Sequence, residues 1–361
     1  MKRTILLMMV FALLLTVFAG AARAEEEELI IYGPHPMDVM DGRIEAFQDW
    51  VAENHGYENV DVNYIQATTM EVFDRVQAEA ENPHGDVFLS VGDLSMRAAE
   101  MGLTEAYKVE TWDRIPEFAR QEDGLWYAQE ILPFVIIYNE NLVEEPPTTW
   151  EELIEPEWEN EVIFRDPTES GTAGTIAVSF LAAYGEEMGF DYLHRLDNTV
   201  GGSYTDSSSR TVYMIGRGER PIAVWNEYFS LTVIDEGYED LSIVYPEDWM
   251  TTGLETVNLI EGRPNERMGE LYMEFAMSDE GARVTAEDFR RPVLQGVEGL
   301  PEWIDEAEDM PILDIDWQKL DDVRTDWLER WDSTVRGEGA DYLEDHPEIP
   351  DYEIIDKYLA D

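Results

Sequence analysis

Residues 29–36 read Leu-Ile-Ile-Tyr-Gly-Pro-His-Pro, an apolar run of β-forming residues that ends in a Gly/Pro turn. This pattern predicts a strand followed by a loop. Apolar residues at helical spacing follow over 38–54, and strand and helix patterns then alternate as far as residue 101. Strand–helix units joined by short connections favour parallel pairing, so we predict an α/β fold.

A second long apolar run, Ile-Leu-Pro-Phe-Val-Ile-Ile-Tyr-Asn, occupies residues 131–139 and predicts another strand. Thr149 is expected to cap a helix, and another helix is expected over 175–184. Further strands are expected over 162–164, 221–225, 242–245 and 256–260, and further helices over 266–277 and 316–330. No internal repeat or low-complexity linker interrupts the 361 residues, so we expect two lobes joined by strands that cross between them.

The predicted lobes are discontinuous in sequence. We expect lobe 1 to comprise residues 25–130 and 251–310, lobe 2 to comprise 131–250, and C-terminal helices in 311–361 to pack on the lobes. Each lobe should contain a mixed, mainly parallel sheet with helices on both faces, and the crossing strands should form a hinge. In such folds ligands bind in the cleft, at the carboxyl ends of strands.

The composition is strongly acidic, with 80 Asp and Glu against 24 Lys and Arg and a net charge of −56. This charge excludes a nucleic-acid binder, which needs a basic face, and it disfavours binding to anionic membranes. Since 44% of the residues are hydrophobic, a core can still form. We interpret the acids as adaptation to a saline environment, because salt screens their repulsion. The alternative, a cation-sequestering protein, lacks support because no calcium-loop repeat occurs.

The N-terminus has the pattern of an export signal. Met1-Lys2-Arg3 precedes an apolar run over 5–18 and then Ala22-Arg23-Ala24, which predicts a signal peptide over 1–24 cleaved after Ala24. A retained membrane anchor is the alternative. The sequence contains no cysteine, so it has neither a lipid-anchor cysteine nor disulfides. We expect a periplasmic or secreted protein.

Motifs of common enzyme classes are absent from the sequence. It contains no G-x-S-x-G elbow, no cysteine nucleophile, no phosphate loop and no G-x-G-x-x-G after a strand. The five histidines lack metal-ligand spacing such as H-E-x-x-H. We therefore expect a protein that is not an enzyme and has no cofactor.

Small hydroxyl-bearing residues recur where predicted strands end and predicted helices begin. The clearest case is Ser170-Gly171-Thr172-Ala173, and Thr68-Thr69, Ser90 and Ser207 occupy similar positions. Hydroxyls and free N–H groups at a helix N-terminus suit an anion, although each serine or threonine can equally be an ordinary cap. Because acids far outnumber bases, we expect neutral donors of this kind, rather than an arginine cluster, to hold an anionic ligand.

Other candidate residues also lie at strand ends. His35 follows the first strand, while Glu227 and Asp206 could accept hydrogen bonds from ligand hydroxyls. Each can also be an ordinary surface residue. Trp317, Trp327 and Trp331 are expected to pack in the core. The predicted ligand-binding set is Pro34, His35, Thr68, Thr69, Ser90, Ser170, Gly171, Thr172, Ala173, Asp206, Trp225, Glu227 and Tyr228.

Several segments together resemble one family. They are LIIYGPHP (29–36), GDVFLSVGDLSMRAAEMGL (85–103), ILPFVIIYNENLV (131–143), PPTTWEELIEPEWENEVIFRDPTESGTAG (146–174), RGERPIAVWNEYF (217–229) and MSDEGARVTAEDFRRPVLQGV (277–297). They resemble periplasmic substrate-binding proteins of ABC importers, in the branch that includes ferric-iron-binding and family 1 extracellular solute-binding proteins. The resemblance implies a type II two-lobed fold that closes around a ligand and delivers it to a membrane permease and its ATPase.

The resemblance also implies where a ferric ion would bind. Ferric relatives use a His in the first loop, an acid after the third strand and a tandem Tyr pair. Here His35 matches, Ser90-Val91-Gly92 stands at the place of the acid, and Tyr228-Phe229 keeps one phenol. A ferric site would therefore rest on His35, Tyr228 and Glu227.

The loss of two oxygen ligands favours a small polar anion, phosphorylated or phosphonate-like, as the ligand of a monomeric receptor that binds no nucleic acid. Relatives with a similar first loop include binders of phosphorylated sugars and phosphonates. Ferric iron or a ferric chelate is the first alternative, and a ligand-sensing module of a signalling system is the second. An enzyme of the same two-lobed shape is a third.

Overall fold

The computed structural model describes residues 27–202, 204–305 and 310–360, so the predicted signal peptide over 1–24 lies outside the described residues. The strands are β1 (Glu27–Gly33), β2 (Val60–Gln66), β3 (Val87–Val91), β4 (Tyr127–Asn139), β5 (Val162–Ile163), β6 (Ile222–Asn226), β7 (Leu241–Val244), β8 (Thr252–Leu259) and β9 (Arg291–Pro292). The α-helices are α2 (Met37–His55), α3 (Thr69–Ala78), α4 (Gly92–Glu100), α5 (Trp150–Leu153), α6 (Gly171–Val200), α7 (Ser208–Gly216), α8 (Glu227–Asp235), α9 (Glu266–Ala276), α10 (Asp279–Glu287), α11 (Glu302–Asp305), α12 (Trp317–Thr334) and α13 (Gly339–Asp345).

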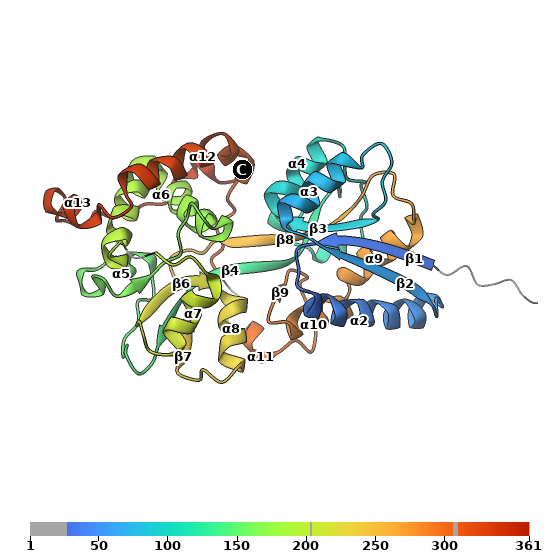
Figure 1. Cartoon of the computed structure of the whole chain (residues 1–361), viewed down its shortest axis with the longest axis horizontal. Coiled ribbons are helices and arrows are strands. Elements are labelled where there is room, and N and C mark those ends of the chain that lie inside the picture. Colours follow the sequence, from blue (N-terminus) through green and yellow to red (C-terminus); the bar gives the residue numbers. More distant parts are fainter. Residues whose placement is uncertain (1–26, 203, 306–309, 361) are drawn as a thin grey trace, which may run out of the picture.

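Two lobes lie side by side and are connected by β4 and β8 (Figure 1). In the first lobe β1 pairs in parallel with β2 and with β3, as the strand–helix alternation predicts. The apolar alternation of β1 buries Leu29 and Ile31 completely. Helices α2, α3 and α4 connect these strands or follow them, so each strand of this lobe ends beside a helix N-terminus.

The crossing strands change the pairing pattern of the sheet. β8 pairs antiparallel with β3 and with the first half of β4, and β4 then continues into the second lobe, where it pairs antiparallel with β6 and β7. Among the named strands of the described residues, parallel pairing occurs between β1 and β2, β1 and β3, and β5 and β6. The sheet is therefore mixed, as predicted, but it is not mainly parallel. The reason is that strands returning across the hinge must run against their neighbours.

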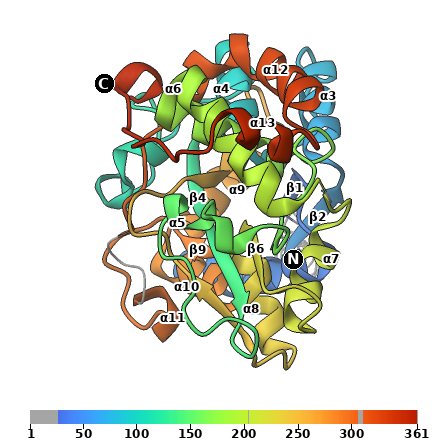
Figure 2. The same cartoon turned by 90° about the vertical axis from the view of Figure 1, so that its left-hand side faces the viewer.

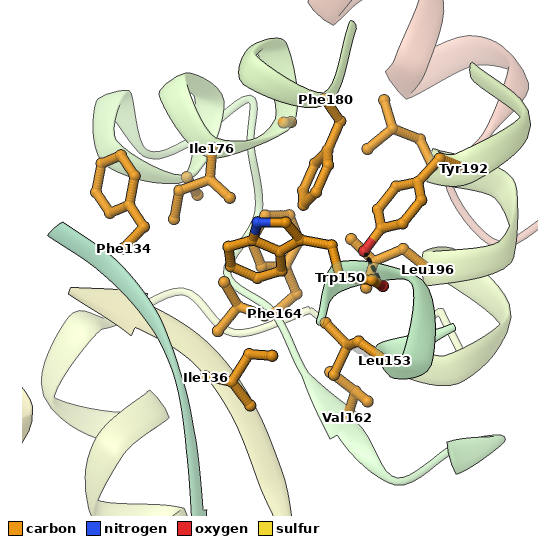
Figure 3. Close-up of a cluster of buried hydrophobic side chains, with 14 of the residues drawn as sticks. Phe134, Ile136, Trp150, Leu153, Val162, Phe164, Ile176, Phe180, Tyr192 and Leu196 are labelled. Atoms are coloured by element: carbon orange, nitrogen blue, oxygen red, sulfur yellow. Dashed lines mark hydrogen bonds between the residues drawn. The ribbon is translucent and has the colours of Figure 1, made fainter. Parts of the chain in front are cut away.

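The core of the second lobe is built around Trp150, which is fully buried (Figure 3). Its indole N–H donates to the carbonyl of Trp249 at 2.8 Å, and its own carbonyl accepts from the hydroxyl of Tyr192 at 2.8 Å. Phe180 packs edge-on against the indole with ring centroids 5.3 Å apart. Thr149 caps α5 through the N–H of Glu152, which confirms the predicted cap. The short segment after the cap is therefore anchored in the lobe 2 core.

Helix α6 is longer than its sequence pattern indicates. We expected a helix over 175–184, whereas α6 begins after its N-cap Ser170 and ends before Gly201, with a kink at Gly185 (φ 78°). Such a positive φ suits glycine, which lacks the Cβ that would be strained there. The early start places residues 171–174 on a helix rather than in a loop.

Apolar side chains gather in separate clusters in the two lobes. One cluster draws on residues 134–250 together with 315–358, and the others draw on 29–131 and 254–294. Helices α12 and α13 pack along α6 (Figure 2). Trp327 and Trp331 are buried in the core as predicted, whereas Trp317 is only partly buried. None of the described helices is long and apolar enough to cross a membrane.

Candidate functional site

A cavity of about 860 Å³ lies between the lobes. The first lobe contributes the loop after β1 and the N-terminal turns of α3 and α4, and the second contributes the N-terminal turns of α6 and α8. The crossing strand β8 and the C-terminal helix α12 complete the walls. The size fits a small organic ligand, since such pockets typically span roughly 300–1,000 Å³.

The N-terminus of α6 opens onto this cavity. Ser170, Gly171 and Thr172 line the cavity, and the hydroxyl of Ser170 accepts from the N–H of Ala173 at 3.2 Å. The first N–H groups of a helix have no partner within the helix and carry its positive dipole end. This wall therefore favours a negatively charged group.

Two arginines also line this cavity, and we refer to them together with the first turn of α6 as the α6 end. Arg165 donates from Nη1 to the hydroxyl of Ser208 at 2.7 Å, and its buried Nε has no hydrogen-bond partner among the described residues. Arg324, on α12, donates to the hydroxyl of Thr175 at 3.2 Å and lies 3.8 Å from Asp93 of the other lobe. The cavity wall therefore contains arginines, whereas we expected neutral donors alone to hold an anionic ligand, and that expectation stays a prediction. Arg165 lies in a loop and Arg324 lies on α12, so the two arginines are far apart in the sequence and form no cluster that a sequence pattern could indicate.

A buried charge cluster lies where β4 and β8 pair, and its members His35, Glu255 and Arg290 line the cavity, in a part that we call the hinge end. Nε2 of His35 lies 3.1 Å from Oε1 of Glu130 and 2.8 Å from Oε2 of Glu255. Arg290 bonds both carboxylates, and Arg43 reaches the other oxygen of Glu130 at 2.7 Å. Burial and mutual pairing make this a structural centre of the hinge as well as a wall of the cavity.

The charges of this cluster determine its proton affinities. Burial alone would raise the pKa of Glu130, but Arg43 and Arg290 hold it well below the ordinary value. Burial disfavours the charged form of His35, yet Glu255 and Glu130 raise its pKa above the ordinary value. The cluster is therefore most stable with an ionised Glu130.

Within the described residues, His35, Glu130 and Glu255 are the one group whose arrangement could hold a metal ion, with ligand atoms within 4.8 Å of one another. Glu130 and Glu255 were not among the residues predicted from the sequence. They lie on β4 and β8 and face each other in register. A glutamate just ahead of the wholly apolar run 131–139 was the available signal, because burying an acid there requires partners.

The sequence matches the bacterial extracellular solute-binding proteins over residues 82–323. The chain belongs to this family. Iron uptake protein A1 of Synechocystis is 24% identical to this solute-binding protein over 288 residues, which covers 76% of this chain and 78% of that protein. A putative 2-aminoethylphosphonate-binding periplasmic protein of Salmonella typhimurium is 24% identical over 246 residues, which covers 66% of this chain and 71% of that protein.

Solved structures share the fold of this solute-binding protein. The periplasmic binding protein AfuA of Actinobacillus pleuropneumoniae, with fructose-6-phosphate bound, superposes with a TM-score of 0.69 at 23% identity, covering 86% of this chain and 99% of that one. The ferric ion-binding protein A of Pasteurella haemolytica gives a TM-score of 0.72 at 18% identity, covering 85% and 97%. The predicted two-lobed binding-protein fold is confirmed.

Only some of the predicted ligand-binding residues of this solute-binding protein line the cavity. The predicted residues that line it are Pro34, His35, Thr69, Ser170, Gly171, Thr172 and Tyr228. The others do not line it: Thr68, Ser90, Ala173, Asp206, Trp225 and Glu227. Their roles as ligand contacts stay predictions.

Several residues outside the cavity wall already have structural roles. Thr68 forms a capping box with Glu71 at the start of α3. Glu227 is buried and paired with Arg291 at 2.6 Å, and its carboxylate also accepts from the hydroxyl of Tyr245 at 2.6 Å. In the alternative ferric set, His35 and Tyr228 therefore face the cavity, whereas Glu227 is held by Arg291. Asp206 is exposed beside Arg210.

A smaller cavity, of about 460 Å³, lies among α6, α12 and α13. Its charged walls are largely paired, since Arg330 bonds Glu186 and Asp191 accepts from Tyr342. The interlobe cavity is therefore the better candidate for solute binding.

Proposed function

We propose that this solute-binding protein captures a small organic anion carrying a phosphoryl or phosphonyl group in the interlobe cavity and delivers it to an ABC importer. The observation that carries the proposal is the open N-terminus of α6 beside Arg165 and Arg324. Helix N–H groups, a serine hydroxyl and arginine donors suit the oxygens of such a group.

The chemistry of the two cavity ends supports a ligand with a charged head and a polar body. The α6 end supplies cationic and N–H donors, while Glu255, Asp288 and the imidazole of His35 stand at the hinge end. Carboxylates accept hydrogen bonds from hydroxyl or amino groups. Relatives named as aminoethylphosphonate-binding, and a structure with fructose-6-phosphate bound, are consistent with this division.

Ferric iron or a ferric chelate is the second candidate ligand. Relatives named for iron uptake favour it, and His35, Glu130 and Glu255 have the residue types of a metal site. The chelate is the stronger form of this alternative, because an iron chelate with a carboxylate ligand also presents anionic oxygens to the α6 end. Bare ferric iron needs several open oxygen ligands.

The biological setting is part of the proposal. We infer a monomeric, non-enzymatic receptor outside the cytoplasmic membrane, released by cleavage after Ala24, with a permease and its ATPase as partners. The family description of extracellular solute binding supports this setting. A sensing role for the same receptor would show itself as a signalling partner in place of the permease.

The test is a ligand screen by thermal shift and calorimetry in about 2 M NaCl, where salt screens the acidic surface. The probes are fructose-6-phosphate, 2-aminoethylphosphonate, inorganic phosphate, ferric citrate and fructose. A ligand at 100 times its Kd stabilises the folded protein by about 2.7 kcal/mol. We expect a phosphorylated or phosphonate probe to bind and fructose not to bind.

A matched pair of variants places the binding site. Arg165→Gln is expected to lower the affinity for the phosphorylated probe by about 10- to 100-fold, because a hydrogen bond to a charged group contributes roughly 1.5–3 kcal/mol. Arg220→Gln is the control, since Arg220 is a loop arginine that does not line the cavity. Binding of ferric citrate alone would reject the proposed ligand class, and equal affinity of both variants for the phosphorylated probe would remove Arg165 from the site.

A further inference from the structure

The group formed by His35, Glu130 and Glu255 has the composition of a metal site, but its oxygen atoms already face a guanidinium. Nε2 of His35 contacts Oε1 of Glu130 and Oε2 of Glu255 at 3.1 and 2.8 Å. Nη1 of Arg290 donates to these same two oxygens, at 3.0 Å for Glu130. Imidazole and guanidinium therefore share one pair of oxygens, where a metal ion would need open positions.

We propose that Arg290 excludes metal ions from the cleft, because its guanidinium occupies the space between the two glutamates where a cation would otherwise bind. Arg290 thus determines specificity against metal ions, because its guanidinium supplies a permanent positive charge where an exchangeable metal ion would otherwise bind. The proposal deepens the proposed function, on which it rests only for the identity of the organic ligand. Exclusion of the metal can be tested separately.

The side chain of Arg290 is buried and is held by several neighbouring groups. It is 5% exposed and lies against Glu130, which is 0% exposed. Its guanidinium carbon lies 4.4 Å from the ring centroid of Tyr228, the phenol that the ferric alternative would use. A cation held over a ring face is stabilised by the ring quadrupole. The guanidinium therefore lies between two carboxylates of the hinge and one aromatic ring of the second lobe.

The charges also argue against an additional metal. Glu130, Glu255 and Asp288 provide three negative charges, and Arg43 and Arg290 provide two positive charges. The three carboxylates and two guanidinium groups therefore leave one formal negative charge. A metal ion would add an uncompensated positive charge to a buried site, which is unfavourable. Without Arg290, the carboxylates and Arg43 would leave two formal negative charges, which a divalent cation can neutralise.

The experiment uses Zn²⁺ as the probe, because imidazole and carboxylates are established zinc ligands. The mature protein, Arg290→Gln and Arg290→Met are titrated by calorimetry in about 2 M NaCl, which screens unspecific binding to surface acids. We expect the unmodified protein to show no zinc site that depends on His35. Each Arg290 variant is expected to bind one Zn²⁺, with affinity falling by about 10-fold or more when His35→Ala is added.

Arg43→Gln is the matched control. It removes one positive charge from the same cluster, but Arg43 contacts the other oxygen of Glu130, at 2.7 Å. The two oxygens shared by His35 and Arg290 stay occupied in this variant. We expect no His35-dependent zinc site, which separates occupation of the site from the loss of charge.

Two results would overturn the proposal. One is a zinc site in the unmodified protein that His35→Ala abolishes, and this arm requires no Arg290 variant to fold. The other is a folded Arg290 variant, judged by near-ultraviolet circular dichroism, that binds no more Zn²⁺ than its His35→Ala counterpart. Fructose-6-phosphate is titrated in parallel into the unmodified protein. Its failure to bind, with the zinc results as expected, would reject the ligand class alone.

Discussion

The two ends of the interlobe cavity differ in how their charges are satisfied. At the hinge end, Glu130 is completely buried and its carboxylate is bonded by His35, Arg43 and Arg290. At the α6 end, the buried Nε of Arg165 has no partner among the described residues. At the hinge end the carboxylates are paired within the protein, and Nδ1 of His35 and Nη1 of Arg43 are the buried atoms without a partner among the described residues. At the α6 end the cavity wall also includes the first turn of a helix, whose N–H groups have no partner within the helix.

This difference separates stability from binding. Groups that already form hydrogen bonds or ion pairs inside the protein stabilise the fold and have few free hydrogen-bonding positions for a ligand. Donors without a partner gain hydrogen bonds when a ligand binds. Variants at the hinge end should therefore change mainly the free energy of unfolding. Variants at the α6 end should change mainly the ligand affinity.

The largest effect is expected from Glu130→Gln. Removing this carboxylate leaves Arg43 and Arg290 without their buried counter-charge, and breaking a buried ion pair typically costs about 3–5 kcal/mol. Urea unfolding in about 2 M NaCl measures the loss. Glu186→Gln, which breaks an exposed pair with Arg330, is the control and should cost about 0–1 kcal/mol. Equal losses in the two variants would remove the distinction between closed and open charges.

The stability difference between the natural chain and Glu130→Gln should also depend on pH. The pKa of Glu130 is held well below its ordinary value of 4.5, so its contribution to stability is complete above that value and is lost as the pH falls through the lowered pKa. Urea midpoints of both proteins should therefore converge as the solution is acidified below pH 4.5. A constant difference over that range would show that Glu130 titrates normally.

A smaller effect, on affinity, is expected from Arg324→Gln at the α6 end. Its contacts with Thr175 and Asp93 are at the cavity rim, so unfolding should change little. Affinity for a phosphorylated ligand should fall by about 10-fold, which corresponds to about 1.4 kcal/mol. Arg330→Gln lies on the same helix outside this cavity and should bind as the natural chain does. Calorimetry that finds both variants equally affected would place Arg324 outside the site.

The smallest effects compare two helix caps. Ser278 caps α10 and Ser170 caps α6, each by accepting a backbone N–H. Loss of a cap costs about 1 kcal/mol of stability, so both alanine variants should show similar urea midpoints. Only Ser170→Ala should also lose ligand affinity, because Ser170 lines the cavity. Unchanged affinity in Ser170→Ala would remove the serine from the proposed anion site.

Much of the fold could be predicted from the sequence, because apolar periodicity reports which face of an element is buried. The run at 131–139 did form part of the crossing strand β4, and Thr149 did cap a helix. The directions in which strands pair were harder to predict from the sequence, since they depend on which lobe each strand enters. The extent of α6 was missed because it depends on backbone geometry at Gly185 and Gly201.

The candidate site was only partly accessible for a different reason. His35 and the Ser170 turn stand beside strand and helix ends, where local patterns draw attention to them. The hinge cluster instead joins His35, Glu130, Glu255 and Arg290, which are far apart in the sequence and meet only through strand pairing. No local spacing distinguishes these residues among 80 acids and 24 bases.

The path of the chain has a practical consequence for measuring closure. β4 and β8 each cross between the lobes, and α12, which follows β9 in sequence, packs in the second lobe (Figure 1), so the described elements change lobe three times along the chain. An odd number of passages leaves β1 in one lobe and the end of the described chain in the other. A pair of fluorophores attached near the two ends, at Glu28 and Asp356, both exposed, would therefore report lobe movement directly as energy transfer. The same two positions would serve for every ligand, since neither lines the cavity.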